Sequence, residues 1–521
     1  MNSLEDPWEL GKRVIIDLFR LSDNGDICEP LRIERRWWDT VAAIRNEVSQ
    51  STGIPHELID IIYEGRKLPL NYSLYQLAVN KNYIKLYFYC RSTIVGSESW
   101  IQVVSTVPVL SSFREALYDV RNAFSVGIIP ELALYGTGGT YFLKDRYKWN
   151  LLVFKPEDEE PFAEHNPRNF QGVTGQSGFR KGIRSGEGWK REVAAYLIDH
   201  GHIFAVPSTV QAHVCHPFFT QRHPKLRFKV GSLQEFVQDA DLVSDWSPSK
   251  FSAFEVQKIA FLDMYLMNTD RNDANIMVCK KRQITADDAF LLIPIDHGYT
   301  MPDRYELNEW SWCWLDWKQM KRPWDNRIVE YAAQLNVQED VRLLNESLGI
   351  RKICLILFRI SGLVLKIGIQ HGLVPYDIAS MYIRRDSSPD APCALEKLVQ
   401  ECVEKLHVLE LLQKMGKTQE NVLSRSLSTR LVDEAEESEE SEEEKAERKR
   451  SGSISQRNLS FQSMASIGYS KEPYRFPEDV EFKLVHDKEY RQMFFNLLEE
   501  GLAFWMVNVM HKRVYDAGIF V

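Results

Sequence analysis

The most informative stretch of the chain is NTDRNDAN at residues 268–275, which is followed by PIDHG at residues 294–298. In the first stretch Asp270 precedes Asn275 by five positions, and the second stretch contributes Asp296. An Asp that accepts the proton of an acceptor hydroxyl, with an Asn and a second Asp on magnesium, is the layout typical of a phosphoryl-transfer site. Oxygen ligands suit such a site because magnesium is a hard cation.

Asp-Arg-Asn alone is a common loop sequence, and a short motif by itself is weak evidence of catalysis. The flanking sequence strengthens it. A strand-like apolar run at residues 276–278 follows Asn275, and another at residues 291–295 leads into Asp296. A hairpin made of these two runs would bring both side chains to one point. The sequence therefore predicts that Asn275 and Asp296 converge.

The composition is that of a large globular protein. Its 521 residues are 44% hydrophobic, which is enough for two or three domains. The formal net charge of −9 provides no global basic footprint, so no nucleic acid is expected as a partner. The eight cysteines are scattered without a C-x-x-C pair, which favours reduced thiols in the cytosol or nucleus over disulfides or a zinc site.

The chain shows no membrane-spanning pattern. Residues 1–12 have no apolar signal core. The most apolar helix-like run, at residues 353–373, carries Arg359 and Lys366, so it is predicted to be a core helix with no transmembrane segment. The expected localisation is cytoplasmic, with peripheral attachment to membranes left open.

Residues 13–90 have the pattern of one compact unit. Apolar or alternating runs at residues 14–19, 31–34 and 84–88 read as strands, and residues 40–51 have helical spacing. The unit resembles ubiquitin. That resemblance is carried by DT at 39–40, GIP at 53–55, IIYEGRKL at 61–68 and SL at 73–74. Ubiquitin's Arg-Gly-Gly tail is replaced by YCR at 89–91, so conjugation through this tail is not expected.

Strand alternation predicts an outward patch on this unit. It consists of Ile62, Lys85 and Tyr87, which would lie where ubiquitin shows its binding surface. Exposed apolar patches usually mark an interface. Two alternatives remain open at this point: docking of ubiquitin-pathway proteins, and packing against the neighbouring domain.

A glycine cluster and a lysine-ended strand come before the opening stretch. The cluster consists of Gly136, Thr137, Gly138, Gly139 and Thr140, and it predicts a turn between two strands. Backbone amides of such a turn can approach phosphate oxygens. Lys155 ends an apolar strand and is suited to contact nucleotide phosphates, and Glu192 opens a helix and is suited to pair with it. The alternatives are an edge-strand lysine and a Glu favoured by the helix dipole.

Six blocks occur in order along the second half of the chain: GTGGTYF at 136–142, FKP at 154–156 with DEEPF at 158–162, REVAAYL at 191–197, VPST at 206–209, NTDR at 268–271 with Asn275, and IPIDHG at 293–298. Together they resemble the phosphatidylinositol 3-/4-kinase superfamily. They are most similar to the type II phosphatidylinositol 4-kinases of the plant-type gamma subfamily, which carry N-terminal ubiquitin-like domains.

The resemblance implies an α+β fold, namely a two-lobed protein-kinase-like catalytic domain behind a ubiquitin-like β-grasp domain. It also implies ATP and Mg²⁺ as cofactors, with the glycine cluster, Lys155 and Glu192 at the nucleotide and with Asn275 and Asp296 on the metal. Asp270 and Arg271 would be the catalytic pair.

The implied reaction is phosphorylation of the 4-hydroxyl of phosphatidylinositol in membranes. One alternative is a protein Ser/Thr kinase recruited through the ubiquitin-like domain. A less favoured one is a ubiquitin-pathway adaptor with an inactive kinase fold. The catalytic loop departs from the family pattern, because Asn272 and Ala274 stand where the family has His and Gly. Alanine fits there only if the backbone does not need a positive φ.

The domain layout expected from these patterns covers the whole chain: a tail at 1–12, the ubiquitin-like domain at 13–90, a connector at 91–130, the catalytic domain at 131–400, a helical extension at 401–415, a disordered acidic and Ser-rich linker at 416–475, and an amphipathic C-terminal helix at 476–521. In the linker, Ser451, Ser453 and Ser455 are candidate phosphorylation sites. The five tryptophans between Trp310 and Trp324 are expected either at a lipid interface or in the core.

Overall fold

The computed structural model describes residues 13–20, 30–36, 38–52, 54, 56, 59–63, 66–77, 83–90, 99–105, 109–220, 229–280, 289–305, 307–384, 391–414 and 474–516. The expectations for the tail at 1–12 and for Ser451, Ser453 and Ser455 lie outside these residues. The chain divides into two compact units. The first comprises Met1–Glu306 and Trp310–Ala379, and the second comprises Leu307–Glu309 and Ser380–Val521.

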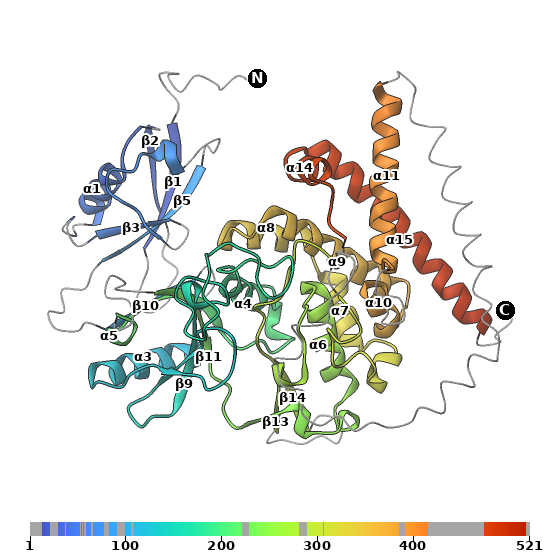
Figure 1. Ribbon diagram of the computed structural model, residues 1–521, viewed down its shortest axis with the longest axis horizontal. Coiled ribbons are helices and arrows are strands. Elements are labelled where there is room, and N and C mark those ends of the chain that lie inside the picture. Colours follow the sequence, from blue (N-terminus) through green and yellow to red (C-terminus); the bar gives the residue numbers. More distant parts are fainter. Residues whose placement is uncertain are drawn as a thin grey trace. The chain divides into compact units, whose positions relative to one another are not determined.

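The first part of the first unit is a β-grasp domain. Its mixed sheet has the order β2-β1-β5-β3-β4, with β1 and β5 parallel at its centre. The strands and helices are β1 (Arg13–Arg20), β2 (Leu31–Arg36), α1 (Val41–Thr52), β3 (Ile59–Tyr63), β4 (Arg66–Lys67), α2 (Leu74–Leu77) and β5 (Tyr83–Cys90). Helix α1 buries Val41, Ile44 and Val48 in the core on one face of the sheet (Figure 1). This topology confirms the predicted ubiquitin-like fold.

The outward patch of this domain is covered in the structure. Ile62 is only 1% exposed, and it packs with Tyr87 and with Val104 of the following domain. The ammonium of Lys85 lies 3.7 Å from the carboxylate of Glu346. Of the two alternatives open from the sequence, packing against the neighbouring domain is therefore the one found.

A six-stranded sheet of order β6-β10-β11-β9-β8-β7 forms the first lobe of the next domain. Its elements are β6 (Trp100–Val104), α3 (Ser111–Ser125), β7 (Glu131–Leu132), β8 (Tyr141–Lys144), β9 (Asn150–Pro156), α4 (Gly188–Leu197), β10 (Thr209–Cys215), α5 (Pro217–Thr220) and β11 (Lys229–Glu235). Helix α3 buries Phe113, Leu117, Val120 and Phe124 against the sheet. The expectation of a connector at 91–130 is thus corrected, because β6 and α3 are parts of this lobe.

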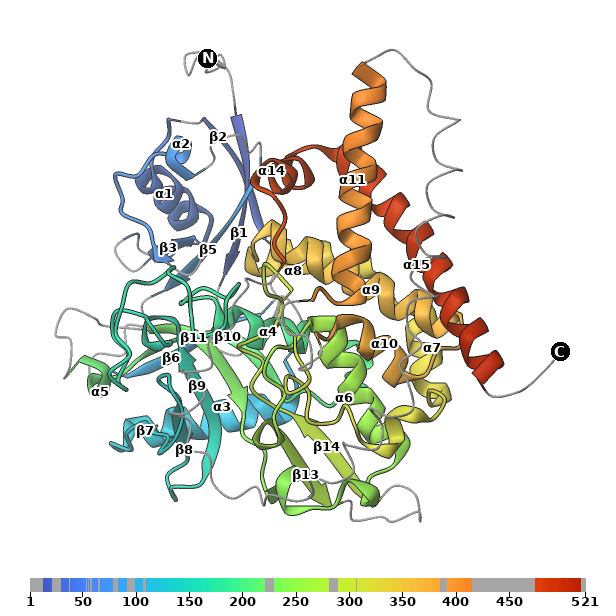
Figure 2. The same cartoon turned by 45° about the vertical axis from the view of Figure 1, so that its right-hand side comes forward.

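The second lobe is mostly helical and holds a small sheet of order β12-β13-β14 (Figure 2). Its elements are β12 (Ala240–Leu242), α6 (Ala253–Leu266), β13 (Ile276–Lys280), β14 (Phe290–Pro294), α7 (Asn326–Gln334), α8 (Val337–Leu348), α9 (Lys352–Gln370) and α10 (Pro375–Tyr382). Within the described residues, α9 is the one helix long and apolar enough to cross a membrane, and 72% of its most apolar window is buried inside the fold. That burial agrees with the predicted core helix.

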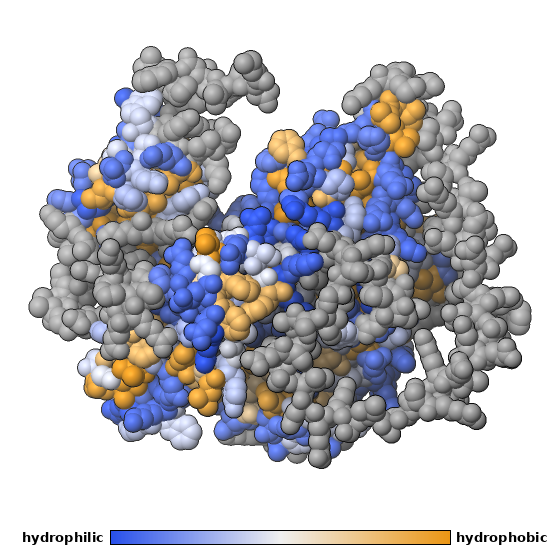
Figure 3. All heavy atoms as spheres, viewed as in Figure 1, coloured by the Kyte–Doolittle hydropathy of each residue, from blue (hydrophilic) through white to orange (hydrophobic). Residues whose placement is uncertain are grey.

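Helices α11 (Ala394–Lys414), α14 (Glu478–His486) and α15 (Lys488–Asp516) build the second unit. A Cβ added at Gly501 of α15 would come within 2.7 Å of Leu398 on α11, so these two helices pack closely. The C-terminal helix therefore docks within the chain. The expected boundary between 400 and 401 falls inside α11, which is one continuous helix. On the face shown in Figure 3, apolar residues form separate patches in a mostly hydrophilic surface.

Candidate functional site

An ammonium group bridges the two lobes. Lys155 lies on β9, near the middle of the six-stranded sheet, where it pairs with Ser232 of β11. Its Nζ is 2.5 Å from Glu192 Oε1 and 3.2 Å from Asp296 Oδ1. Burial alone would lower the pKa of Lys155, but the two carboxylates outweigh burial and raise it. Lys155 therefore stays charged, and it joins the first lobe to the loop that follows β14.

Glu192 is fixed on both of its oxygens. It is 2% exposed on α4, and its second oxygen accepts a 3.0 Å hydrogen bond from the backbone N–H of His297. Burial acts to raise the pKa of Glu192, but the charge of Lys155 and the side chain of His297 more than offset it and lower the pKa. The ion pair predicted from the sequence is thus present, and α4 is tied directly to the segment that carries Asp296.

The loop that carries Asp270 follows the end of α6 and is held by side chains. Met267 ends the helix in a left-handed conformation, with φ of +48°. The Asn268 side chain then donates to Asp263 at 2.9 Å and accepts from the backbone N–H of Asp270 at 3.0 Å. These bonds fix the direction that the chain takes after α6, and so the position of Asp270.

Arg271 is fully buried and organises the same loop. Its Nε lies 2.9 Å from Asp263 Oδ1, and its Nη1 donates to the carbonyls of Asn275 and Ile295 at 2.6 and 2.5 Å. With no exposed atoms and all these protein partners, Arg271 is a positioning residue. The catalytic role expected for it from the resemblance stays a prediction.

Asp270 is partly buried and lies beside a cation that the sequence did not point to. Its Oδ1 accepts a 2.8 Å hydrogen bond from Arg180 Nη2, and its side chain is 23% exposed. Burial raises the pKa of Asp270, Arg180 opposes that rise, and the nearby carboxylate of Asp296 adds to it. Asp270 and Asp296 are therefore close enough to influence each other electrostatically.

The hairpin predicted from the sequence brings the two expected metal ligands to one end. β13 and β14 pair with Ile276 opposite Pro294, and the backbone N–H of Ile295 donates to the carbonyl of Asn275 at 3.0 Å. The Asn275 amide donates to the carbonyl of Asp270 at 3.0 Å, which leaves its oxygen as the acceptor end. Asp296 has φ of +55°, an uncommon conformation that is typical of functional sites.

The donor set suits a hard cation. Asn275 and Asp296 supply one amide oxygen and one carboxylate, the ligand types that magnesium takes in proteins. In the part of the chain that the structure describes, no group of three or more His, Cys, Asp or Glu side chains is placed to hold a metal. A site built from these two residues therefore fits magnesium whose remaining ligands are nucleotide phosphates and water.

Ala274 occupies a position that does not require glycine. It lies in a 3₁₀ turn at Asp273–Asn275 and has no positive φ. Asn272 caps this turn, because its side chain accepts from the backbone N–H of Ala274 at 3.0 Å. The two departures from the family pattern are thus compatible with an ordered loop.

The glycine cluster forms the predicted turn between β7 and β8, whose strands pair with Leu132 opposite Tyr141. A side chain at Gly139 would clash with the carboxylate of Glu159, and its N–H donates to the Glu159 carbonyl at 2.9 Å. The turn is therefore packed onto the segment after β9. The amide of Gly139 is already engaged there, so phosphate contacts must come from other groups of the turn.

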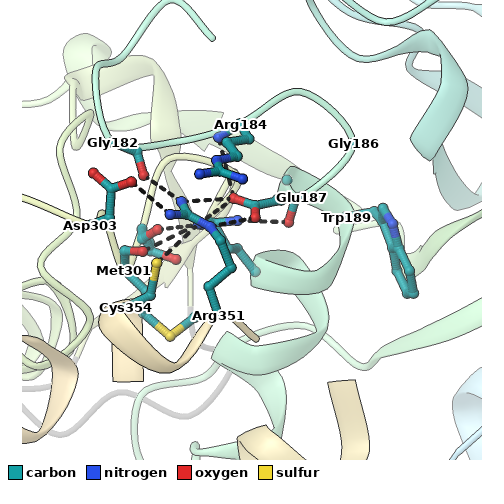
Figure 4. A network of polar contacts seen from close by, with 12 residues as sticks. Gly182, Arg184, Gly186, Glu187, Trp189, Met301, Asp303, Arg351 and Cys354 are labelled. Carbon is teal, nitrogen blue, oxygen red and sulfur yellow. Dashed lines mark hydrogen bonds and ion pairs between the residues drawn. The ribbon is translucent and has the colours of Figure 1, made fainter. Parts of the chain in front are cut away.

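A second network of polar contacts joins the loop before α4 to the second lobe, and Figure 4 shows it. Arg351, just before α9, donates to Glu187 at 2.6 Å, to Asp303 at 2.6 Å and to the carbonyl of Gly182 at 2.9 Å. Arg191 of α4 also binds Glu187, at 3.0 Å. The cations Arg191 and Arg351 outweigh burial and lower the pKa of Glu187 to about 2. The loop before α4 is thereby fixed to the second lobe.

The tryptophans after Asp296 belong mainly to the core. Trp312 and Trp314 are at most 1% exposed, with ring centroids 4.9 Å apart. The indole N–H of Trp312 donates to the Asn268 carbonyl at 2.7 Å, and that of Trp314 donates to Asp263 at 2.8 Å. Trp310 is 44% exposed. Of the two expectations, the core explains Trp312 and Trp314, which support the loop of Asp270.

Sequence reasoning missed Asp263, Arg180 and Arg351. Asp263 is a carboxylate in the apolar second half of α6, and a charge in such a run is a usable signal because a buried charge needs a partner. Arg180 and Arg351 lie in ordinary basic sequence, and only long-range packing reveals their partners.

Residues 136–357 match the protein family described as phosphatidylinositol 3- and 4-kinase. Phosphatidylinositol 4-kinase gamma 4 of Oryza sativa subsp. japonica is 36% identical over 307 residues, which cover 57% of this chain and 52% of that protein. Phosphatidylinositol 4-kinase gamma 2 of Arabidopsis thaliana is 31% identical over 375 residues, which cover 66% of each chain. The chain therefore spans about half the length of the first relative and about two thirds of the second.

Among solved structures, a ubiquitin from Caldiarchaeum subterraneum covers 16% of this chain and 98% of its own length, with 22% identity and a TM-score of 0.14. The ubiquitin-like fold of residues 13–90 is established by the strand order given above. The family match spans the segment that carries Lys155, Asp270 and Asp296. These residues lie in a catalytic domain that belongs to the phosphatidylinositol 3- and 4-kinase family.

Proposed function

We propose that this chain transfers the γ-phosphoryl group of ATP to the 4-hydroxyl of phosphatidylinositol. The observation that carries the proposal is the position of the Lys155 ammonium between Glu192 and Asp296, together with the hydrogen bond that joins Asn275 to the Asp270 backbone. The names of the relatives support the choice of acceptor. We also propose that the protein acts in the cytoplasm and attaches peripherally to membranes that contain this lipid.

In this mechanism Lys155 holds the nucleotide phosphates, and the glycine turn covers them from the first lobe. Asn275 and Asp296 would hold magnesium, which when bound neutralises charge on the β- and γ-phosphates. Asp270 orients the acceptor hydroxyl and receives its proton. The contribution of the protein is thus positioning and charge neutralisation.

A second candidate function uses the same chemistry on a different acceptor. The ubiquitin-like domain supports a protein Ser/Thr kinase that is recruited to ubiquitin-pathway proteins through Ile62, Lys85 and Tyr87. That route requires the patch to be released from Val104 and Glu346, which cover it in the structure. The lipid reaction needs no such release, and for this reason we favour it.

The test is an assay with labelled ATP in which phosphatidylinositol micelles and a protein acceptor are compared side by side, for the wild type and for Asp270→Asn. Label in the lipid that disappears in the variant is the expected result. Label only in protein would favour the second candidate. ATP binding without γ-phosphoryl consumption on any acceptor would overturn the kinase activity and support an adaptor.

A further inference from the structure

The outer patch of the ubiquitin-like domain, defined as Ile62, Lys85 and Tyr87, faces a specific surface of the first unit. Ile62 and Tyr87 are register partners on β3 and β5, so their side chains point to the same face of the sheet. That face is opposite the one that packs on α1. An isoleucine on the outer face of a small sheet reaches 1% exposure only when another surface covers it.

Only one end of the outer face of the sheet is covered. Ile15 on β1 lies on the same outer face, because it pairs in parallel register with Tyr83, two residues before Lys85 on β5. Ile15 is nevertheless 43% exposed. One end of the outer face is therefore buried and the other is open, which makes Ile15 a matched reference for the patch.

The surface that receives the patch is made of three elements. Val104 of β6 packs with Ile62 and Tyr87. Tyr87 also lines a cavity of about 20 Å³ together with Val193 of α4 and Leu348 of α8. A cavity of that size has room for a water molecule and none for a ligand. The contact is therefore a packed interface between two domains.

Helix α4 links this interface to the site. Val193 and Leu197 are four residues apart, so they share one side of the helix, and both line the cavity beside Tyr87. Glu192 is the residue next to Val193 and lies about 100° further round the helix. Its carboxylate is bound to Lys155 and to the backbone of His297. A shift of α4 that loosened the packing of Val193 and Leu197 would therefore also disturb the contacts of Glu192.

We propose that the ubiquitin-like domain is the intramolecular partner of its own catalytic domain and that it braces α4. In the docked state the patch holds the side of α4 formed by Val193 and Leu197, and this keeps Glu192 against Lys155. The docked state is the active one. A protein that binds the ubiquitin-type patch must displace the catalytic domain first, and its binding loosens α4. The brace does not depend on which acceptor the kinase uses.

Docking is tested by thiol accessibility in the full chain. Ile62→Cys and Ile15→Cys are each treated with a maleimide, and mass spectrometry follows the label at the introduced position. The thiol at position 62 should react at least about tenfold more slowly than the thiol at position 15, because its reaction requires undocking. Equal rates at the two positions would show that the patch is open and would overturn the proposal.

The effect on α4 is tested by hydrogen exchange and kinetics with Ile62→Glu, Tyr87→Glu and the control Ile15→Glu. Both patch variants should speed amide exchange in residues 188–197 by about tenfold or more and should lower kcat/KM for ATP. The control should change neither. Patch variants that undock while α4 keeps its wild-type exchange would refute the brace. Because exchange needs no turnover, this readout stands even if the proposed lipid reaction is wrong.

A milder pair of variants covers the case in which a buried Glu prevents folding. Lys85→Glu and Glu346→Lys reverse the charges of the 3.7 Å ion pair at the rim of the interface, although Lys85 also lies 5.8 Å from the centroid of the Phe19 ring within its own domain. Each single variant should weaken docking about twofold to fivefold, as measured by the labelling rate in the Ile62→Cys background. The double variant restores the attraction with reversed charges and should return the rate to its original value. Additive losses in the double variant would contradict the contact.

Discussion

Arg180 Nη2 donates a hydrogen bond of 2.8 Å to Asp270 Oδ1, although the two residues are 90 positions apart in the chain. The cation opposes the effect of burial on the pKa of Asp270, which is raised nonetheless. The residue proposed to accept a proton is thus held between two opposing influences, and its ionisation depends on a loop that precedes α4.

Removal of this cation should shift the pH dependence of activity. In Arg180→Ala the pKa of Asp270 rises further, so the acid limb of the kcat/KM profile should move up by about one pH unit. The sign follows because only the ionised carboxylate accepts a proton. Arg184→Ala is the control, since that side chain is exposed in the same loop. An unchanged acid limb in Arg180→Ala would show that the contact between Arg180 and Asp270 does not control the ionisation that limits activity.

Asp270→Asn should remove activity without unfolding the protein. Loss of the proton acceptor should lower kcat by about 10²-fold or more. Because the fold raises the pKa of Asp270, ionised Asp270 is unfavourable for folding, and the neutral amide should leave Tm within about 2 °C of the wild type or higher. The matched control is Asp273→Asn, an exposed carboxylate in the same loop. A large fall in Tm would mean that the activity loss reports unfolding.

Lys155→Met should both weaken ATP use and destabilise the first unit, because the carboxyl group of Glu192, which is 2% exposed, would lose its cation. Removing one member of a buried ion pair costs about 3–5 kcal/mol of unfolding free energy. The double variant Lys155→Met with Glu192→Gln should be more stable than the single one, as urea unfolding would show. Lys148→Met, at an exposed turn between β8 and β9, should behave like the wild type.

The network around Glu187 predicts a specific loss of stability in acid. The pKa of Glu187 is about 2 in the folded protein and 4.5 ordinarily, so the unfolded chain binds the proton first. Its contribution, on the order of 3 kcal/mol, is present above pH 4.5 and disappears as the pH falls towards 2. Urea unfolding across this range should therefore show a steeper loss for the wild type than for Glu187→Gln. Parallel curves would assign the acid sensitivity to other groups.

Ala274→Gly tests whether the departure from the family pattern limits activity. Ala274 has no positive φ, so glycine offers no conformational advantage there and mainly adds freedom to the unfolded chain. The variant should lose about 0.5–1 kcal/mol of stability and keep its kcat. A clear rise in kcat would show that the native alanine restrains the loop.

The sequence by itself determined the features that rest on local pattern. Alternating runs predicted the strands of one compact N-terminal unit, and its resemblance to ubiquitin predicted the β-grasp fold. Two apolar runs predicted the hairpin that brings Asn275 and Asp296 together, and a lysine at a strand end with a glutamate at a helix start predicted the pairing of Lys155 with Glu192. Each of these follows from periodicity within a few residues, or from side chains that such elements carry at fixed ends.

Tertiary structure alone decided the rest. Burial of Arg271 against Asp263, the contact of Arg180 with Asp270, and the covering of Ile62 by Val104 all join segments whose local sequences do not refer to each other. The local sequence around an outward-facing apolar residue or a loop arginine is the same whether its side chain faces solvent or contacts another domain. The contacts of these side chains depend on how whole helices and strands pack. That packing joins segments far apart in the sequence, and it buries the patch of the ubiquitin-like domain in an interface within the chain.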